Sequence, residues 1–95
     1  MVAEFEVHET IVLEERGLFA LAGAVVEGTP RTGMRATAGK GGDRFDARVH
    51  GVEFLEDAAG SEPALTFSYG DEATLERWRA LDWPGRTVEL GWAGS

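Results

Sequence analysis

The chain has 95 residues, a net charge of −8 and no cysteine. Its length fits one domain, residues 1–95, with one small core, and the lack of cysteine excludes disulfides and thiolate metal sites. No apolar run approaches the roughly 18 residues of a membrane helix, and no secretion leader is recognisable. We therefore expect a cytoplasmic protein that does not bind membranes.

The first segment with a clear pattern is 4–14, in which apolar and polar side chains alternate as in a half-buried strand. Glu9 interrupts the alternation, so we expect a β-bulge or a strand end near it. The apolar side of this strand would carry Phe5, Val7, Ile11 and Leu13.

Residues 18–27 are almost continuously apolar and lie between Gly17 and Gly28, which favours a buried central strand. Residues 44–56 alternate cleanly and change phase at Gly51, the usual sign of a bulge. Shorter strands are expected at 34–38 and 65–69, with loops over 39–43 and 57–63.

The pattern changes to a helical one after the strand at 65–69. Asp71 can cap a helix that runs to Leu81, with Leu75 and Trp78 on its buried face. Pro84 and Gly85 then stop it, and a closing strand follows over 87–92.

Six short strands and one late helix predict a mainly β fold. The expected architecture is a small six-stranded closed or nearly closed β-barrel with one short helix in the C-terminal half of the chain. A two-sheet sandwich is the alternative.

Glycine spacing suggests a family. The sequence resembles the second, β-barrel domain of translational GTPases such as elongation factor Tu. The resemblance covers about residues 4–92 and rests on Arg16-Gly17, on the spacing of Gly23, Gly28 and Gly33, on Gly51-Val52-Glu53-Phe54 and on Pro84-Gly85-Arg86-Thr87-Val88. Two departures are an extra residue between Gly17 and Gly23 and a longer helix around Trp78. No GTPase domain is attached in this chain.

The resemblance implies that Glu53 would contact the 3′ end of an aminoacyl-tRNA, together with a basic residue shortly after it. Glu56 stands at that basic position and Asp57 follows it. Negative charge repels a phosphate backbone, so we expect the fold without this RNA contact. Glu53 is then a solvated or turn-bonding carboxylate, and nucleic-acid binding is not expected.

Other motifs point away from catalysis and cofactors. Lys40 precedes its glycines and a strand follows, which does not fit a phosphate-binding loop, so no nucleotide is expected. No serine lies in a nucleophile-elbow motif. His8 and His50, with Glu6 and Asp46, could hold zinc or manganese only if their strands pair. We therefore expect neither an enzyme nor a metal or cofactor site.

Aromatic and basic residues near the C-terminus are the remaining candidates for binding. Trp83 precedes Pro84 and is expected to be partly exposed, as an anchor for a protein partner. Trp78 is expected to pack the helix on the barrel, and Trp92 to close the end of the barrel. Arg77, Arg79 and Arg86 flank these tryptophans and join Glu53 and Trp83 as candidate binding residues.

The sequence therefore predicts a non-catalytic, stand-alone barrel similar to domain 2 of translation factors, which binds a protein partner or itself. One alternative is a small-ligand-binding barrel, for which the chain is too short to offer a roomy lumen. The other is a barrel that binds RNA or tRNA ends through Arg44, Arg48, Arg77, Arg79 and Arg86.

Overall fold

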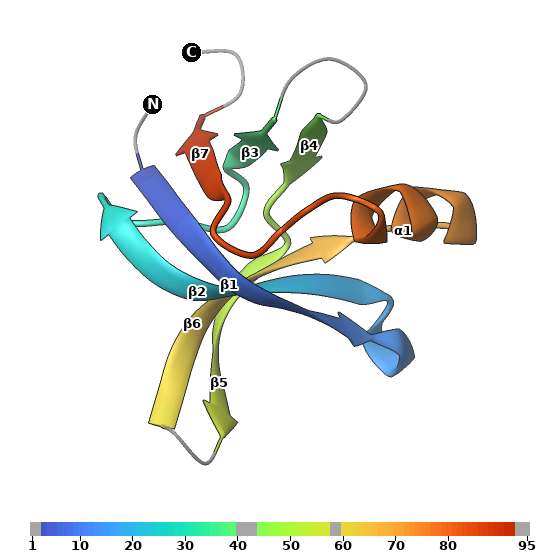
Figure 1. The fold of residues 1–95 in the computed structure, drawn as a ribbon, viewed down its shortest axis with the longest axis horizontal. Helices are drawn as coiled ribbons and strands as arrows, with labels where there is room; N and C mark the ends of the chain where they lie inside the picture. Colours follow the sequence, from blue (N-terminus) through green and yellow to red (C-terminus); the bar gives the residue numbers. More distant parts are fainter. Residues whose placement is uncertain (1–2, 40–43, 58–59, 93–95) are drawn as a thin grey trace.

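A computed structural model describes residues 3–39, 44–57 and 60–92. Within these residues the chain forms a seven-stranded antiparallel sheet and one α-helix (Figure 1). The elements in chain order are β1 (Ala3–Leu13), the 3-10 turn η1 (Glu14–Arg16), β2 (Leu18–Glu27), β3 (Arg35–Ala38), β4 (Phe45–Arg48), β5 (Gly51–Asp57), β6 (Gly60–Ser68), α1 (Glu72–Arg79) and β7 (Thr87–Gly91).

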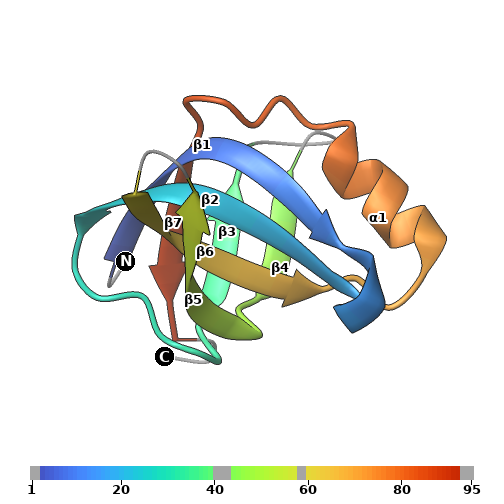
Figure 2. The same ribbon diagram turned by 90° about the horizontal axis from the view of Figure 1, so that it is seen from below.

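The strand order across the sheet is β4-β3-β7-β1-β2-β6-β5. The two strands β4 and β5 follow one another in the chain, yet they lie at opposite edges of the sheet. No ladder joins these edges in the described part of the chain, and the sheet curls into a half-barrel with α1 at one end (Figure 2). The mainly β fold with one late helix is confirmed, whereas the closed six-stranded barrel is wrong in both strand number and closure.

The seventh strand arises because the expected strand 44–56 is two strands. Val49 donates its N–H to the Met34 carbonyl at 2.8 Å, beside β3, whereas the His50 N–H bonds to the Thr66 carbonyl of β6 at 2.7 Å. The chain therefore leaves one edge of the sheet and joins the other within two residues. Gly51, expected to form a bulge, instead begins β5 after this corner.

The hairpin of β5 and β6 is longer than expected. Its ladder continues to the pair Asp57–Gly60, so much of the expected loop over 57–63 belongs to strands. Residues 58–59 lie outside the described part of the chain, as do residues 40–43 of the other expected loop. This hairpin projects away from the rest of the sheet at the bottom of Figure 1.

A β-bulge in β1 confirms the expectation raised by Glu9. Val7 pairs with Gly23 and Glu9 with Ala22, which leaves His8 as the extra residue. A bulge shifts the alternation of side chains by one position. Val12 therefore packs against the core beyond the bulge, where the unbroken pattern would have placed Ile11.

Gly23 allows β1 and β2 to cross closely at this bulge. A Cβ atom added to Gly23 would lie 1.9 Å from the backbone oxygen of Glu6. No side chain fits at that distance, so the position requires glycine.

An aromatic cluster fills the space between the two edges of the sheet. Phe45 of β4 lies 5.0 Å from Phe67 of β6, measured between ring centroids, with an interplanar angle of 85°. Its ring also lies 5.0 Å from Trp83 and 5.2 Å from Trp78. Phe19 of β2 completes the cluster at 5.8 Å from Trp78. Edge-to-face contacts of this kind stabilise beyond the area that they bury.

The helix that carries Trp78 is capped as expected. Asp71 accepts a hydrogen bond from the Thr74 N–H at 2.8 Å, and this bond holds the pKa of the Asp71 carboxyl below its ordinary value. The helix ends at Arg79, two residues before the expected Leu81. The Leu81 N–H instead turns back to the Trp78 carbonyl at 3.3 Å and closes the last turn.

The expectation that Trp83 is partly exposed is wrong. Trp83 is only 2% exposed, because its indole N–H donates to the Trp78 carbonyl at 2.6 Å inside the aromatic cluster. The Trp78 carbonyl at the end of α1 thus accepts a second hydrogen bond beside the one from the Leu81 N–H. Trp92, expected to close the end of the barrel, is 46% exposed and lies beside Gly33.

Replacing Trp83 with phenylalanine should destabilise the protein by about 1–3 kcal/mol, because the buried Trp78 carbonyl loses a donor while an aromatic ring is kept. Urea unfolding would measure this change. The matched control is Trp92→Phe at a half-exposed site, expected to stay within about 0.5 kcal/mol of the parent. Equal effects of the two changes would contradict the role assigned to the indole N–H.

Candidate functional site

Glu53 is held by an ion pair that the sequence did not predict. Arg16, in the turn between β1 and β2, donates to both carboxylate oxygens of Glu53, from Nη1 at 2.9 Å and from Nη2 at 2.5 Å. The pKa of the Glu53 carboxyl lies below its ordinary value, chiefly because of the hydrogen bond from Arg16. The carboxylate that the family resemblance would assign to RNA therefore already has a cation bound to it.

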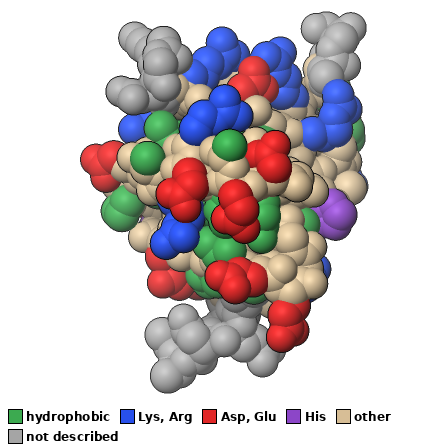
Figure 3. All heavy atoms as spheres, turned by 90° about the vertical axis from the view of Figure 1, so that its right-hand side faces the viewer, with side chains coloured by type: hydrophobic (Ala, Val, Ile, Leu, Met, Phe, Trp, Pro, Cys, Tyr) green, Lys and Arg blue, Asp and Glu red, His purple; other side chains and the backbone are tan. Residues whose placement is uncertain are grey.

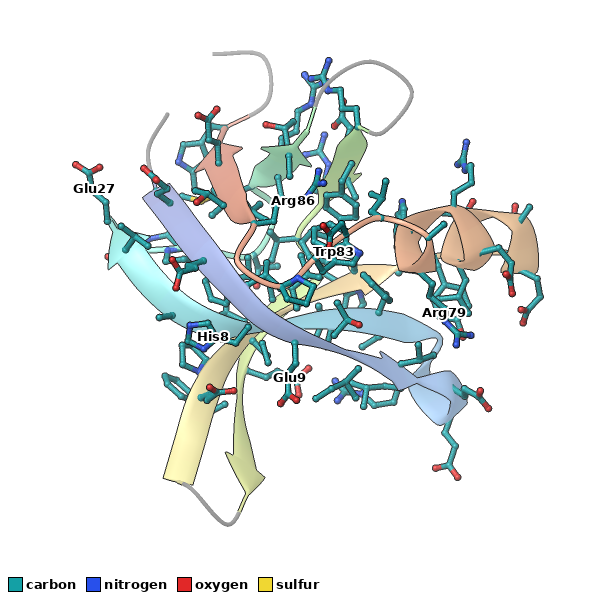
Figure 4. The ribbon with its side chains drawn as sticks, in the orientation of Figure 1. His8, Glu9, Glu27, Arg79, Trp83 and Arg86 are labelled. Atoms are coloured by element: carbon teal, nitrogen blue, oxygen red, sulfur yellow. The ribbon has the colours of Figure 1, made fainter. Side chains whose placement is uncertain are left out.

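The candidate arginines near the C-terminus do not form one surface. Arg77 and Arg79 lie two positions apart in the last turn of α1, a spacing that points side chains to different sides of a helix. Figure 4 shows Arg79 pointing from α1 toward the end of the β1–β2 hairpin, away from Arg86. Arg86 is half-buried, donates from Nε to the Asp82 carbonyl at 2.8 Å and lies 6.0 Å from the Trp83 ring centroid.

Positive charge gathers instead on the hairpin of β3 and β4. Arg35 of β3 pairs directly opposite Arg48 of β4. Asp46 lies two residues before Arg48 on β4. Arg35 donates from Nε to Asp46 at 2.8 Å and makes a second, very short contact through Nη2. Arg44 lies 3.6 Å from the same carboxylate. The pKa of Asp46 is therefore held below its ordinary value, first of all by Arg35.

The charge of this hairpin is opposite to that of the rest of the chain. The sequence from 31 to 50 contains five bases and two acids, whereas the remainder contains four bases and fifteen acids. On the side of the molecule that carries α1, acidic side chains spread across the middle while Lys and Arg side chains lie mostly at the top (Figure 3). The excess of bases over acids is therefore confined to the sequence from 31 to 50.

An exposed apolar group lies on the opposite edge of the sheet. Phe54 of β5 is 70% exposed and Val52 is 36% exposed. Their strand pairs with β6 alone in the described part of the chain, which leaves its other backbone edge open. The phase change at Gly51 predicted both side chains as the apolar set of their strand. It could not show that this strand forms an edge, and sequence reasoning therefore missed the pair as a surface.

The two histidines lie apart. His8 contacts Glu62 at 3.2 Å through Nδ1 and Glu6 at 3.3 Å through Nε2. His50 stands at the corner between β4 and β5, and β1 pairs only with β2 and β7 among the described strands. The strand pairing that a shared metal site would need is therefore not formed. No cluster of three or more potential metal ligands occurs in residues 3–39, 44–57 and 60–92.

Comparison of the sequence and the fold with protein-family models, curated proteins and solved structures gives no match. The resemblance to domain 2 of translational GTPases therefore stays a prediction. No helix in the part of the chain that the structure describes is long and apolar enough to cross a bilayer.

The pKa of His8 is raised above the ordinary 6.5 by its hydrogen bonds to Glu62 and then Glu6. Because the folded state binds this proton more tightly than the unfolded state does, protonation of His8 stabilises the fold. Its contribution to stability is complete below the unfolded pKa near 6.5 and disappears as the pH rises through the higher, folded value. An NMR titration of the imidazole should give a midpoint above 6.5.

The variant Glu62→Gln should lower that midpoint, because it removes the carboxylate whose hydrogen bond raises the His8 pKa most. The control Glu9→Gln removes the charge of the exposed acid that follows His8 in the chain, and it should leave the midpoint in place. An unchanged midpoint in Glu62→Gln would show that this pair does not form in solution.

Proposed function

We propose that this chain is a non-catalytic protein-interaction module that binds an extended segment of its partner along the open edge of β5. The observation that carries the proposal is the 70% exposure of Phe54 on an edge strand. Aromatic side chains are enriched at protein interfaces relative to the rest of a protein surface. An exposed phenylalanine beside a half-exposed Val52 offers such an anchor.

The backbone of β5 supplies the second element of recognition. An edge strand presents unpaired N–H and C=O groups, to which another extended chain can add as a new strand. Backbone hydrogen bonds then provide affinity, and alternate side chains provide specificity. Val52 and Phe54 are two residues apart and so lie on one face of β5, where both can contact alternate side chains of the added strand.

The charge of the hairpin indicates the kind of partner. Its sequence from 51 to 62 contains four acids, Glu53, Glu56, Asp57 and Glu62, and no base. Two copies joined through their β5 edges would bring these acids together, and like charges across strands are destabilising. A segment with alternating apolar and basic residues is attracted instead. The occupant of this edge is therefore a basic, extended segment of another protein.

The resemblance to translational GTPases supports the same class of function. In those proteins the second domain docks against neighbouring domains, and a separate copy of such a barrel would offer its docking surface to a partner. The tRNA contact is not part of this proposal, since Glu53 is occupied by Arg16.

The probe for this proposal is a peptide of alternating lysine and valine, titrated into the isotope-labelled protein and followed by NMR. Amide shifts should concentrate at residues 51–54, and binding should weaken with added salt. Phe54→Ser should weaken binding about tenfold, or about 1.4 kcal/mol. Val26→Ser is the matched control, because Val26 is 58% exposed at the far end of β2.

Two further peptides separate strand addition from other modes of binding. A peptide methylated on alternate backbone nitrogens should not bind, because it cannot donate the hydrogen bonds of a ladder. A peptide of alternating glutamate and valine should not bind either. Equal binding of the methylated or the acidic peptide, dimerisation of the protein alone through β5, or amide shifts confined to another edge would contradict the proposal.

A further inference from the structure

A pocket of about 440 Å³ opens at the corner where β4 passes into β5. Pockets for small molecules typically have volumes of 300–1,000 Å³. The residues that line it come from three separate segments, namely Thr32, Gly33, Arg48, Val49, His50 and Ser68. None of them was predicted to form a common site.

The backbone around this pocket is held by hydrogen bonds across the corner. The Gly33 N–H donates to the Val49 carbonyl at 2.9 Å, and the Val49 N–H donates to the Met34 carbonyl at 2.8 Å. Gly33 adopts a φ of +91°, which a residue with a side chain rarely takes. The pocket is therefore part of the fold rather than a gap between side chains of a loop.

The lining is rich in hydrogen-bond donors, and none of its described residues carries a carboxylate. Arg48 supplies a guanidinium group, Thr32 and Ser68 supply hydroxyls, and His50 supplies an imidazole. The Arg48 guanidinium donates from Nη1 to the Gly33 carbonyl at 3.3 Å. Within the described residues no acid forms an ion pair with the Arg48 guanidinium. The Arg35 guanidinium, in contrast, is paired with Asp46.

We propose that this pocket binds the phosphate group of a small phosphorylated molecule. A phosphate monoester carries several acceptor oxygens, which suit a guanidinium fork together with hydroxyl donors. A carboxylate has only two oxygens and would leave part of this donor set unused. The surrounding sequence from 31 to 50, with its excess of bases, adds attraction for an anion.

The volume indicates that the phosphate is attached to a further group. A cavity of this size exceeds the space needed by one phosphate ion. Trp92 lies next to the pocket, since a Cβ atom added to Gly33 would be 3.6 Å from Cζ3 of its ring. The indole of Trp92 is therefore a reporter for binding. This site lies on the basic side of the corner and does not depend on the proposed peptide site on β5.

The experiment uses phenyl phosphate, inorganic phosphate and benzoate as probes for the labelled protein, with amide and indole signals recorded by NMR. Phenyl phosphate should shift the amides of 32–33, 49–50 and 68 and the Trp92 indole. Inorganic phosphate should shift the same amides more weakly. Tighter binding of the ester identifies a phosphorylated molecule as the source of the anion, whereas equal binding identifies free phosphate. Benzoate has the same ring with a carboxylate and should cause no saturable change.

Two variants distinguish binding in this pocket from general attraction of an anion to the positive charge around it. Arg48→Gln should weaken phenyl phosphate at least tenfold, because a charge-assisted hydrogen bond is lost. Arg44→Gln removes the same charge just before the start of β4, outside the pocket, and should change the affinity less than about twofold. Equal weakening by both variants, equal binding of benzoate, or no saturable shift with 10 mM ester (about −2.7 kcal/mol) would overturn the proposal.

Discussion

The ring of Phe45 packs between the two edges of the sheet, which no backbone ladder joins directly in the described residues. Its strand β4 forms one edge, and Phe67 stands on β6 near the other edge, with 5.0 Å between the two ring centroids. Trp78 of α1 and Trp83 of the following turn fill the remaining space around these rings. Side-chain packing thus holds the half-barrel together where a closed barrel would use hydrogen bonds. The helix is a structural part of this closure, since its Trp78 carbonyl receives the Trp83 indole N–H.

Both proposed binding surfaces follow from this incomplete closure. An open sheet must have two edges, and β5 is the edge that keeps Phe54 exposed. The chain crosses from one edge to the other at Val49 and His50, and the pocket opens at this crossing. Charge separates the two surfaces, because the pocket lies beside the basic β3–β4 hairpin whereas the sequence of the β5–β6 hairpin is acidic.

Features that depend on neighbouring residues could be predicted from the sequence. The bounds of β2, the Asp71 cap and the bulge near Glu9 each follow from a local pattern of apolar, polar or capping residues. The division of 44–56 into two strands could not be predicted in this way. Apolar and polar side chains can alternate on both sides of a corner in the chain. Only the pairing with distant strands shows that the chain has changed direction there.

The candidate site depended still more on distant contacts. Arg16 and Glu53 are 37 residues apart, and nothing near either residue indicates their ion pair. Trp83 is buried because a helix carbonyl lies within reach of its indole, whereas Trp92 is half-exposed beside Gly33. Composition alone could not distinguish these two tryptophans. The pocket unites three segments whose residue types are ordinary for a protein surface.

A double-mutant cycle on Phe45 and Phe67 tests the account of closure most directly. Phe45→Leu, Phe67→Leu and the double variant would be unfolded in urea under identical conditions. The structure predicts a coupling energy of about 0.5–1.5 kcal/mol between the two rings, the range for an edge-to-face aromatic pair. Additive effects, within about 0.3 kcal/mol, would show that the two edges of the sheet are not held together by these rings.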